Sequence, residues 1–175
     1  AGDNGPCGPD TEMYYDVSNK LGGKGLTHEE FIKADDARDV VEIWNDVFMQ
    51  YEKKDGKIIG KLPKPSVDTG AGLERLCMTL QGVDNIYDTD LLKPVMDKIK
   101  SISSNYNEKS ARILADHIRA SVMLISDGVI PSNSDRGYVL RKLIRRSVRH
   151  ADKLATNGNI LEIVEVIQNK YKEIY

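Results

Sequence analysis

The sequence has few cysteines and no long apolar run. Only Cys7 and Cys77 occur among 175 residues, and neither has a second Cys or a His at the short spacing of metal sites. We therefore expect two reduced thiols and no structural zinc in this segment. No apolar stretch approaches the roughly 20 residues that a membrane-spanning helix needs, and the first ten residues lack the features of a signal peptide. These absences predict a cytosolic protein without membrane contact.

An initiator Met is also absent, and a Gly/Pro-rich loop over residues 1–10 leads directly into a strand pattern. We therefore expect an internal segment of a longer protein. The charge is uneven, since residues 1–100 carry 13 Lys and Arg against 19 Asp and Glu, whereas residues 101–175 carry 12 against 8. This asymmetry predicts different partners for the two parts of the chain.

The periodicity of apolar residues predicts an α+β fold. Residues 11–17 and 40–51 have the β-branched and aromatic content of strands, and the turn at 54–56 should close a hairpin onto residues 57–60. Short helices are expected from Thr27 to about residue 35 and from residue 73 to Gly82. Beyond residue 88 the pattern becomes helical, with helices expected over residues 91–102, 110–126, 138–154 and 160–175. We therefore expect an antiparallel sheet domain over residues 1–87 and an all-α region over residues 88–175.

The most specific local feature is the segment DTGAGLER at residues 68–75, where a strand becomes a helix. Gly70 and Gly72 allow the backbone to approach a ligand closely. The N-terminus of the helix favours an anion, and Arg75, one turn along, can pair with a phosphate through its planar fork. Taken alone, such a turn more often only packs a helix against a strand, and it lacks the residues of a P-loop or of a dinucleotide fingerprint.

The expected helix at 138–154 carries cations of one sign. Arg141, Arg145 and Arg149 recur every four residues beside an apolar stripe formed by Leu140, Leu143, Ile144, Val148 and Ala151. A solvated charged face is the simpler interpretation, but basic clustering of this kind, with Arg136 just ahead of it, is typical of phosphate contact. Asn133 or Ser134, in the turn before the helix, is a candidate N-cap.

Three blocks in order resemble the alanyl-tRNA synthetase family of class II synthetases. They are GPCGPDTEMYYD at residues 5–16, EIWNDVFMQY at 42–51 and LPKPSVDTGAGLER at 62–75. The likeness continues through ADHIRA at 115–120 and DGVIPSNSDRGYVLRKLIRR at 127–146. It covers nearly the whole chain except about the last twenty residues, and it is similar to class II motif 3 over residues 66–80.

The resemblance implies an ATP-dependent activation of alanine with magnesium, followed by transfer of the alanyl group to the 3′ end of its tRNA. It places Arg75 on the γ-phosphate of ATP, with Gly70 and Gly72 against the nucleotide. It pairs Asp68 with the ammonium group of alanine. Loss of a buried charge pair costs roughly 3–5 kcal/mol, more than the 1–3 kcal/mol of a methyl-sized pocket, so Asp68 is expected to matter most.

The resemblance also implies that Trp44, Asn45 and Val47 help to form the alanine pocket, and that Asn133 reads the G:U pair in the acceptor stem of alanine tRNA through the minor groove. The upstream motifs 1 and 2, with a second phosphate-binding arginine, are not part of this chain. Because several positive groups act together in adenylate chemistry, we expect the isolated chain not to aminoacylate. Two alternatives stay open, a stand-alone RNA-binding module that uses residues 137–154 and an unrelated ATP-binding regulator.

Overall fold

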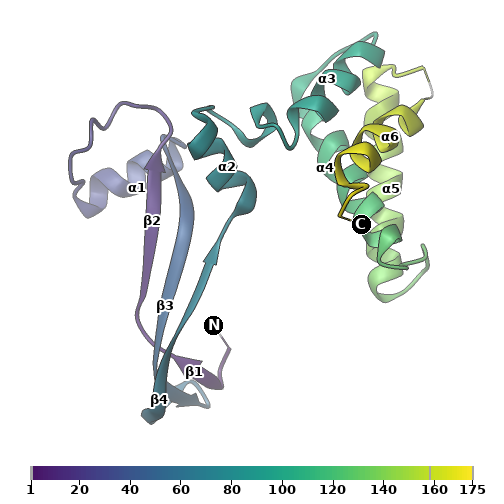
Figure 1. Cartoon of the computed structure of the whole chain (residues 1–175). Helices are drawn as coiled ribbons and strands as arrows, with labels where there is room; N and C mark the ends of the chain where they lie inside the picture. The colour runs from purple at the N-terminus through teal and green to yellow at the C-terminus, as the bar shows by residue number, and fades with distance from the viewer. Residues whose placement is uncertain (1, 158, 175) are drawn as a thin grey trace. The chain divides into compact units, whose positions relative to one another are not determined.

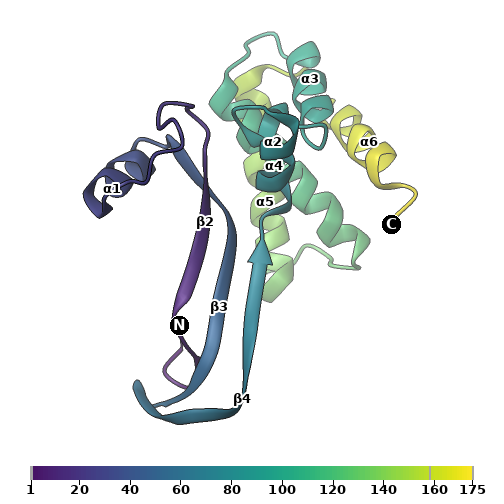
Figure 2. The same cartoon turned by 60° about the vertical axis from the view of Figure 1, so that its left-hand side comes forward.

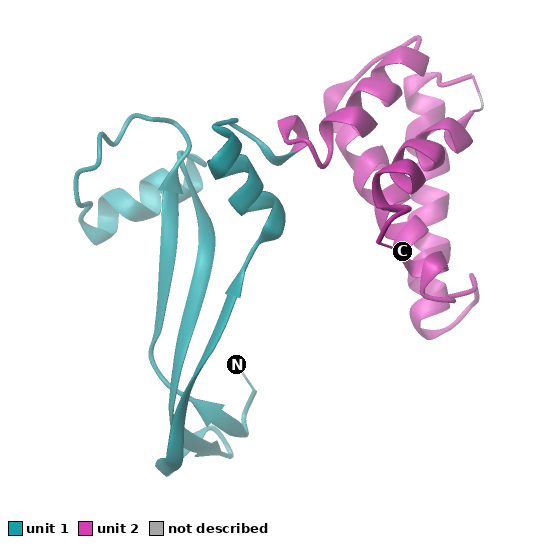
Figure 3. Cartoon of the chain, in the orientation of Figure 1, with its two compact units in different colours: residues 1–86 teal, residues 87–175 magenta. Residues whose placement is uncertain are grey.

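A computed structural model describes residues 2–157 and 159–174 of the chain. The chain divides into two compact units, residues 1–86 and residues 87–175 (Figure 3). The first unit contains all the strands of the described residues, and the second consists of helices.

The first unit is built around one long central strand. Its strands are β1 (Gly5–Cys7), β2 (Asp10–Asp16), β3 (Val40–Lys54) and β4 (Lys57–Ala71). All pairings are antiparallel, with β1 and β2 following one edge of β3 and β4 following the other. β2, β3 and β4 run side by side along most of their length in both views (Figures 1 and 2). The strand and hairpin pattern expected from the sequence is confirmed.

The expected loop over residues 1–10 is wrong in part, because residues 5–7 form β1. Cys7 pairs with Tyr51 and Gly5 with Lys53, so the Gly/Pro-rich segment adds a short strand to the edge of β3. Gly8, directly after β1, lies against the backbone of β3. A Cβ atom at this position would lie 1.7 Å from the backbone O of Phe48, so only glycine lets the two backbones approach.

The β3–β4 hairpin turns at Asp55 and Gly56, which both have positive φ (48° and 76°), as a two-residue hairpin turn with matching twist requires. The returning strand is much longer than expected and runs to Ala71. Its register shifts between Tyr51, which pairs with Lys61, and Met49, which pairs with Ser66. Pro63 and Pro65 fall in this irregular stretch, because proline has no N–H to donate to the ladder.

Two helices lie at the end of the sheet away from β1 and the hairpin (Figures 1 and 2). Helix α1 (His28–Asp36) begins after its N-cap Thr27, as the sequence predicted, and Thr27 also forms a capping box with Glu30. The Phe31 ring meets Tyr14 of β2 edge to face at 4.7 Å. Helix α2 (Leu73–Gln81) follows β4 after Gly72 and ends at Gly82, which has left-handed backbone geometry.

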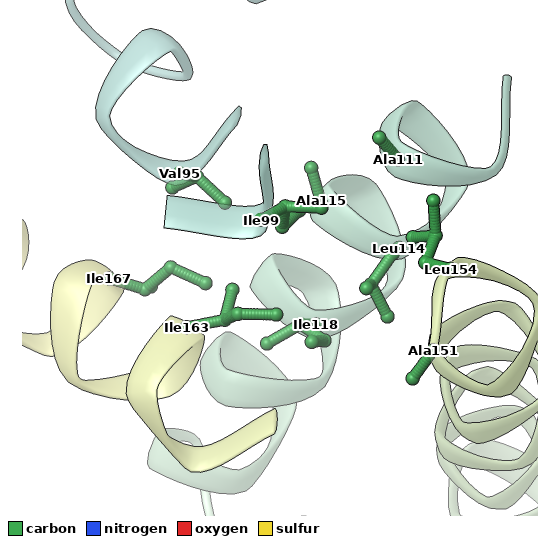
Figure 4. Close-up of a cluster of buried hydrophobic side chains, with 10 residues drawn as sticks. All are labelled: Val95, Ile99, Ala111, Leu114, Ala115, Ile118, Ala151, Leu154, Ile163 and Ile167. Atoms are coloured by element: carbon green, nitrogen blue, oxygen red, sulfur yellow. The ribbon is translucent and has the colours of Figure 1, made fainter. Parts of the chain in front are cut away.

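The second unit follows a short 3-10 turn, η1 (Ile86–Asp88), and packs four helices around one core. The helices are α3 (Lys93–Ile102), α4 (Glu108–Ser126), α5 (Asp135–Leu154) and α6 (Ile160–Tyr171). Ile99, Leu114, Leu154 and Ile163 are completely buried in this core, one from each helix (Figure 4). The helical region expected from the sequence is therefore confirmed.

Several boundaries and faces in this unit differ from expectation. α5 begins at Asp135, three residues early, and α6 ends at Tyr171 rather than running to residue 175, which lies outside the described residues. Val148 is 46% exposed rather than buried, because Ser147 occupies the core-facing position instead. Ser134 takes the N-cap position of α5, but its side chain makes no capping hydrogen bond.

None of the helices in residues 2–157 and 159–174 is long and apolar enough to cross a membrane. Cys7 and Cys77 are free, as expected.

Candidate functional site

An open cavity of about 820 Å³ lies where β3, β4 and the start of α2 meet. It contains most of the residues that the sequence pointed to in this unit. The lining residues are Val41, Glu42, Asn45, Val47, Asp68, Thr69, Gly70, Ala71, Gly72, Glu74, Arg75 and Ile86. The strand-to-helix turn at residues 68–75 and the block at residues 42–51 thus converge on one cavity, although about twenty residues separate them in sequence.

An irregularity in β3 determines which side chains reach this cavity. Met13 of β2 pairs with Trp44, but the next residue, Tyr14, pairs with Glu42, so Ile43 is skipped. Such a β-bulge changes the alternation of side chains along a strand. In a regular strand Val41, Ile43, Asn45 and Val47 would share a face. Val41, Asn45 and Val47 line the cavity, Glu42 lines it too, and Ile43 does not.

Arg75 is held in the cavity by Glu42. Its Nη1 donates to the backbone O of Glu42 at 2.8 Å and to the carboxylate Oε2 at 3.1 Å. The aliphatic part of Arg75 passes close to Gly72, where an added Cβ would lie 3.1 Å from Arg75 Cδ. A side chain at position 72 would therefore crowd the arginine stem. The sequence analysis missed Glu42, because only the bulge turns it toward Arg75.

Asp68 and the expected alanine-pocket residues lie on the neighbouring strands. Val47 pairs directly with Asp68, and Asn45 pairs directly with Gly70. Asn45 Nδ2 also donates to Glu12 Oε1 of β2 at 3.3 Å. The expected loss of roughly 3–5 kcal/mol on removing Asp68 assumed a buried charge pair. That assumption is wrong for residues 1–175 by themselves, because Asp68 is exposed.

Trp44 is not among the residues that line the cavity, which differs from the expected pocket. Its indole Nε1 instead donates to Thr69 Oγ1 at 2.6 Å, and Thr69 Oγ1 donates to the backbone O of Asn45 at 3.3 Å. Trp44 thus contacts the cavity wall indirectly, by fastening β4 to β3 between Asp68 and Gly70. This role of Thr69 could not be predicted from the sequence, because the contact joins residues 25 positions apart.

The basic residues of α5 gather on one exposed face. They line a hollow of about 460 Å³ formed by Tyr138, Arg141, Lys142, Arg145, Arg146 and Arg149. Asn133 Oδ1 accepts a hydrogen bond from Arg141, so the turn before the helix is linked to this face. Arg136 is exposed but does not line the hollow. The six residues that line the hollow are called the basic face.

The turn that carries Asn133 packs tightly on α5. Ser132 N donates to the backbone O of Gly137 at 3.0 Å. A Cβ at Gly137 would lie 2.5 Å from the backbone O of Ile130 and 2.3 Å from Ser132 Oγ. Glycine is therefore required for the close approach that places Asn133 beside the basic face.

Within the described residues no group of three or more His, Cys, Asp or Glu side chains is arranged to hold a metal ion. The cavity offers separate carboxylates from Glu42, Asp68 and Glu74 beside one arginine.

Comparison with known proteins gives the class of this fold and site. The chain belongs to the tRNA synthetases class II (A), whose family model matches residues 1–175. It is 51% identical over 160 residues to the alanine–tRNA ligase of Acidithiobacillus ferridurans, covering 87% of this chain. It is 44% and 45% identical over 181 residues to the alanine–tRNA ligases of Pseudoalteromonas translucida and Shewanella loihica, covering 99% of this chain.

These matches confirm the family resemblance and the α+β fold class expected from the sequence. The chain spans only 18–20% of the length of these relatives. Because the matches extend over both units, a stand-alone RNA-binding module is not favoured.

Proposed function

We propose that this chain forms part of an alanine–tRNA ligase, which activates alanine with ATP and transfers it to the 3′ end of alanine tRNA. The observation that carries the proposal is the convergence of Asp68 and Arg75 on one cavity, in a chain whose relatives bear that name. A carboxylate and a guanidinium on the same cavity match the ammonium and phosphate ends of an aminoacyl-adenylate.

In this proposal Asp68 pairs with the ammonium group of alanine, while Asn45 and Val47 line the pocket for its small side chain. Trp44 acts through its hydrogen bond to Thr69, which holds β4 beside β3. Val47 lies directly opposite Asp68, so the apolar wall and the carboxylate face the same space. In this arrangement the methyl group of alanine packs against Val47.

Arg75 binds the γ-phosphate of ATP, and Gly70 and Gly72 let the nucleotide lie along the backbone. An added Cβ at Gly70 would meet nothing within 4 Å, so packing inside this chain does not demand glycine there. A ligand on that backbone supplies a reason for it. Magnesium enters this scheme with ATP as part of the substrate, where it neutralises phosphate charge.

The basic face of α5 binds the acceptor stem of alanine tRNA. Arg141, Arg145 and Arg149 contact phosphates, which fix the register of the duplex, with Arg136 at its margin. Asn133 reads the G:U pair from the minor groove, where base edges are accessible in A-form RNA. Its hydrogen bond from Arg141 supports this role, because an acceptor bond at Oδ1 leaves the amide NH₂ to donate to the RNA.

In this proposal the reaction takes place in the cytosol. It is carried out by a polypeptide of the relatives' length that contains residues 1–175, here called the full-length chain. The isolated residues 1–175 are expected to be inactive, since Arg75 is the only arginine that lines the described cavity.

The test is alanine-dependent ATP–pyrophosphate exchange, measured with the full-length chain and with residues 1–175 alone. We expect exchange only in the full-length chain, and a loss of at least about 100-fold when Arg75 is replaced by Ala. Absence of alanine-dependent exchange in the full-length chain would contradict the proposed reaction. Unchanged exchange in Arg75→Ala would contradict the role of the arginine.

A further inference from the structure

Glu42 is not among the residues expected to act, yet it makes two contacts with Arg75. We infer that Glu42 is a positioning residue, which holds the Arg75 guanidinium in the orientation that binds a phosphate of ATP. The inference rests on the proposed function, because it requires Arg75 to bind phosphate. Without its pairing to Arg75, the negative charge of Glu42 would disfavour an anion in this cavity.

The first support is the backbone irregularity that brings Glu42 to the cavity. Side chains alternate along a strand, so Glu42 and Asn45 would face opposite sides of a regular β3. Because the pairing with β2 skips Ile43, both line the same cavity. Bulges occur frequently next to active sites, where they redirect a side chain. Here the bulge puts a carboxylate beside Arg75.

The second support is the pattern of donors on the guanidinium. Arginine has five N–H groups, two of them on Nη1. Both contacts with Glu42, to its backbone O at 2.8 Å and to Oε2 at 3.1 Å, are made by Nη1. The N–H groups of Nε and Nη2, which form another edge of the planar group, take no part in either contact. That edge can pair with a phosphate through two parallel hydrogen bonds while Glu42 keeps its hold.

The third support is that the pair contributes little to folding. The Arg75 and Glu42 side chains are 45% and 34% exposed, and ion pairs exposed to solvent usually stabilise a fold only slightly. We therefore expect the Glu42–Arg75 ion pair to affect the orientation of Arg75 rather than the stability of the fold. Loss of the carboxylate should weaken ATP binding without lowering the melting temperature.

The experiment is a double-mutant cycle between Glu42→Gln and Arg75→Lys in the full-length chain, read by ATP–pyrophosphate exchange at varied ATP and varied alanine. Lysine keeps the charge of Arg75 but cannot contact Glu42 and a phosphate through two planar edges. We expect Glu42→Gln alone to raise KM for ATP about tenfold, with KM for alanine and the melting temperature unchanged. In the Arg75→Lys background the same change should cost less than about twofold, because the group that Glu42 positions is gone.

Glu52→Gln is the matched control, since Glu52 is a carboxylate on the same strand and does not line the cavity. It should leave all these values unchanged. Equilibrium dialysis of ATP gives the same comparison if Arg75→Lys exchanges too slowly to measure.

Equal losses from Glu42→Gln in both backgrounds would overturn the inference, because Glu42 would then act on a different group, such as a metal ion bound with the nucleotide. No effect of Glu42→Gln on KM for ATP would overturn it too. Either result is distinct from failure of the proposed function, in which the unaltered full-length chain shows no alanine-dependent exchange.

Discussion

Val47 and Asp68 lie directly opposite each other in the antiparallel pairing of β3 with β4. Side chains of directly paired residues share one face of a sheet, with Cβ atoms about 5 Å apart. Both residues line the same cavity. An apolar branched side chain and a carboxylate are thus held next to each other by backbone hydrogen bonds, on strands whose hairpin turn lies far along the sheet.

Replacement of Asp68 by Asn in the full-length chain should raise KM for alanine about 10- to 100-fold. Asparagine keeps the shape of the side chain but loses the charge, and a hydrogen bond to a charged group contributes roughly 1.5–3 kcal/mol. The measurement is alanine-dependent ATP–pyrophosphate exchange. Asp46→Asn serves as the control, because Asp46 is the neighbour of Val47 and does not line the cavity. Equal effects of the two changes would argue against an ammonium site at Asp68.

Replacement of Gly70 by Ala should weaken ATP binding and leave the melting temperature unchanged. An added Cβ at this position meets nothing of the protein within 4 Å, so any effect must come from a ligand that lies on the backbone. Gly60→Ala is a matched control on the same strand, since its added Cβ also meets nothing within 4 Å. ATP binding by equilibrium dialysis with the full-length chain provides the test. If both variants bind ATP as the unaltered protein does, the nucleotide does not lie against Gly70.

Replacement of Arg145 and Arg149 by Gln should weaken binding of an acceptor-stem hairpin and reduce its dependence on salt. Each lost phosphate contact should lower the slope of log affinity against log salt concentration by a little under one unit. Affinities measured in the full-length chain at several salt concentrations give this slope. Lys109→Gln on α4 is the control, because it removes an exposed positive charge away from the basic face. A slope that falls equally in the control would mean that net charge, rather than this face, sets the affinity.

Replacement of Gly137 by Ala should destabilise the second unit and also weaken binding of the same hairpin. The new methyl group would lie 2.5 Å from the Ile130 backbone O, and overpacking of this kind typically costs about 1–3 kcal/mol. Urea unfolding of residues 1–175 measures the loss. Val139→Ala, at an exposed position of the same helix, should change the unfolding free energy much less. A Gly137→Ala protein as stable as the control would show that the turn before α5 is free to move aside.

Two histidines in the second unit should make its stability depend on pH. Burial lowers the pKa of His150, helped by the charges of Lys153 and Arg146, and burial also lowers the pKa of His117. Their folded-state pKa values lie below the unfolded value of 6.5, so the unfolded chain binds more protons between these values. Stability is therefore complete above pH 6.5 and is lost as the pH falls from there through the folded pKa.

Urea unfolding of residues 1–175 between pH 5 and pH 8 tests this dependence. Replacement of both His117 and His150 by Gln should flatten the profile below pH 6.5. An unchanged slope in this variant would assign the acid sensitivity to carboxylates.

The sequence alone was sufficient for the features that depend on neighbours along the chain. The helix start at Thr27, the turn at residues 54–56 and the Gly82 helix end were all predicted, because caps and turns depend on a few adjacent residues. The family resemblance was also predicted from the sequence, since its blocks are contiguous. Apolar periodicity located α3 to α6 to within a few residues, because helix formation follows the 3.6-residue repeat.

Only the tertiary structure decided which distant side chains meet. The skip at Ile43 depends on the register of β2 against β3, and it turns Glu42 toward Arg75. Pairing between strands far apart in the chain also produces the hydrogen bond from Trp44 to Thr69 and the strand at residues 5–7. Packing between helices leaves Val148 46% exposed. Periodicity specifies which residues share a face, but it does not specify which strand lies opposite, since that choice depends on the packing and hydrogen bonds of the whole sheet.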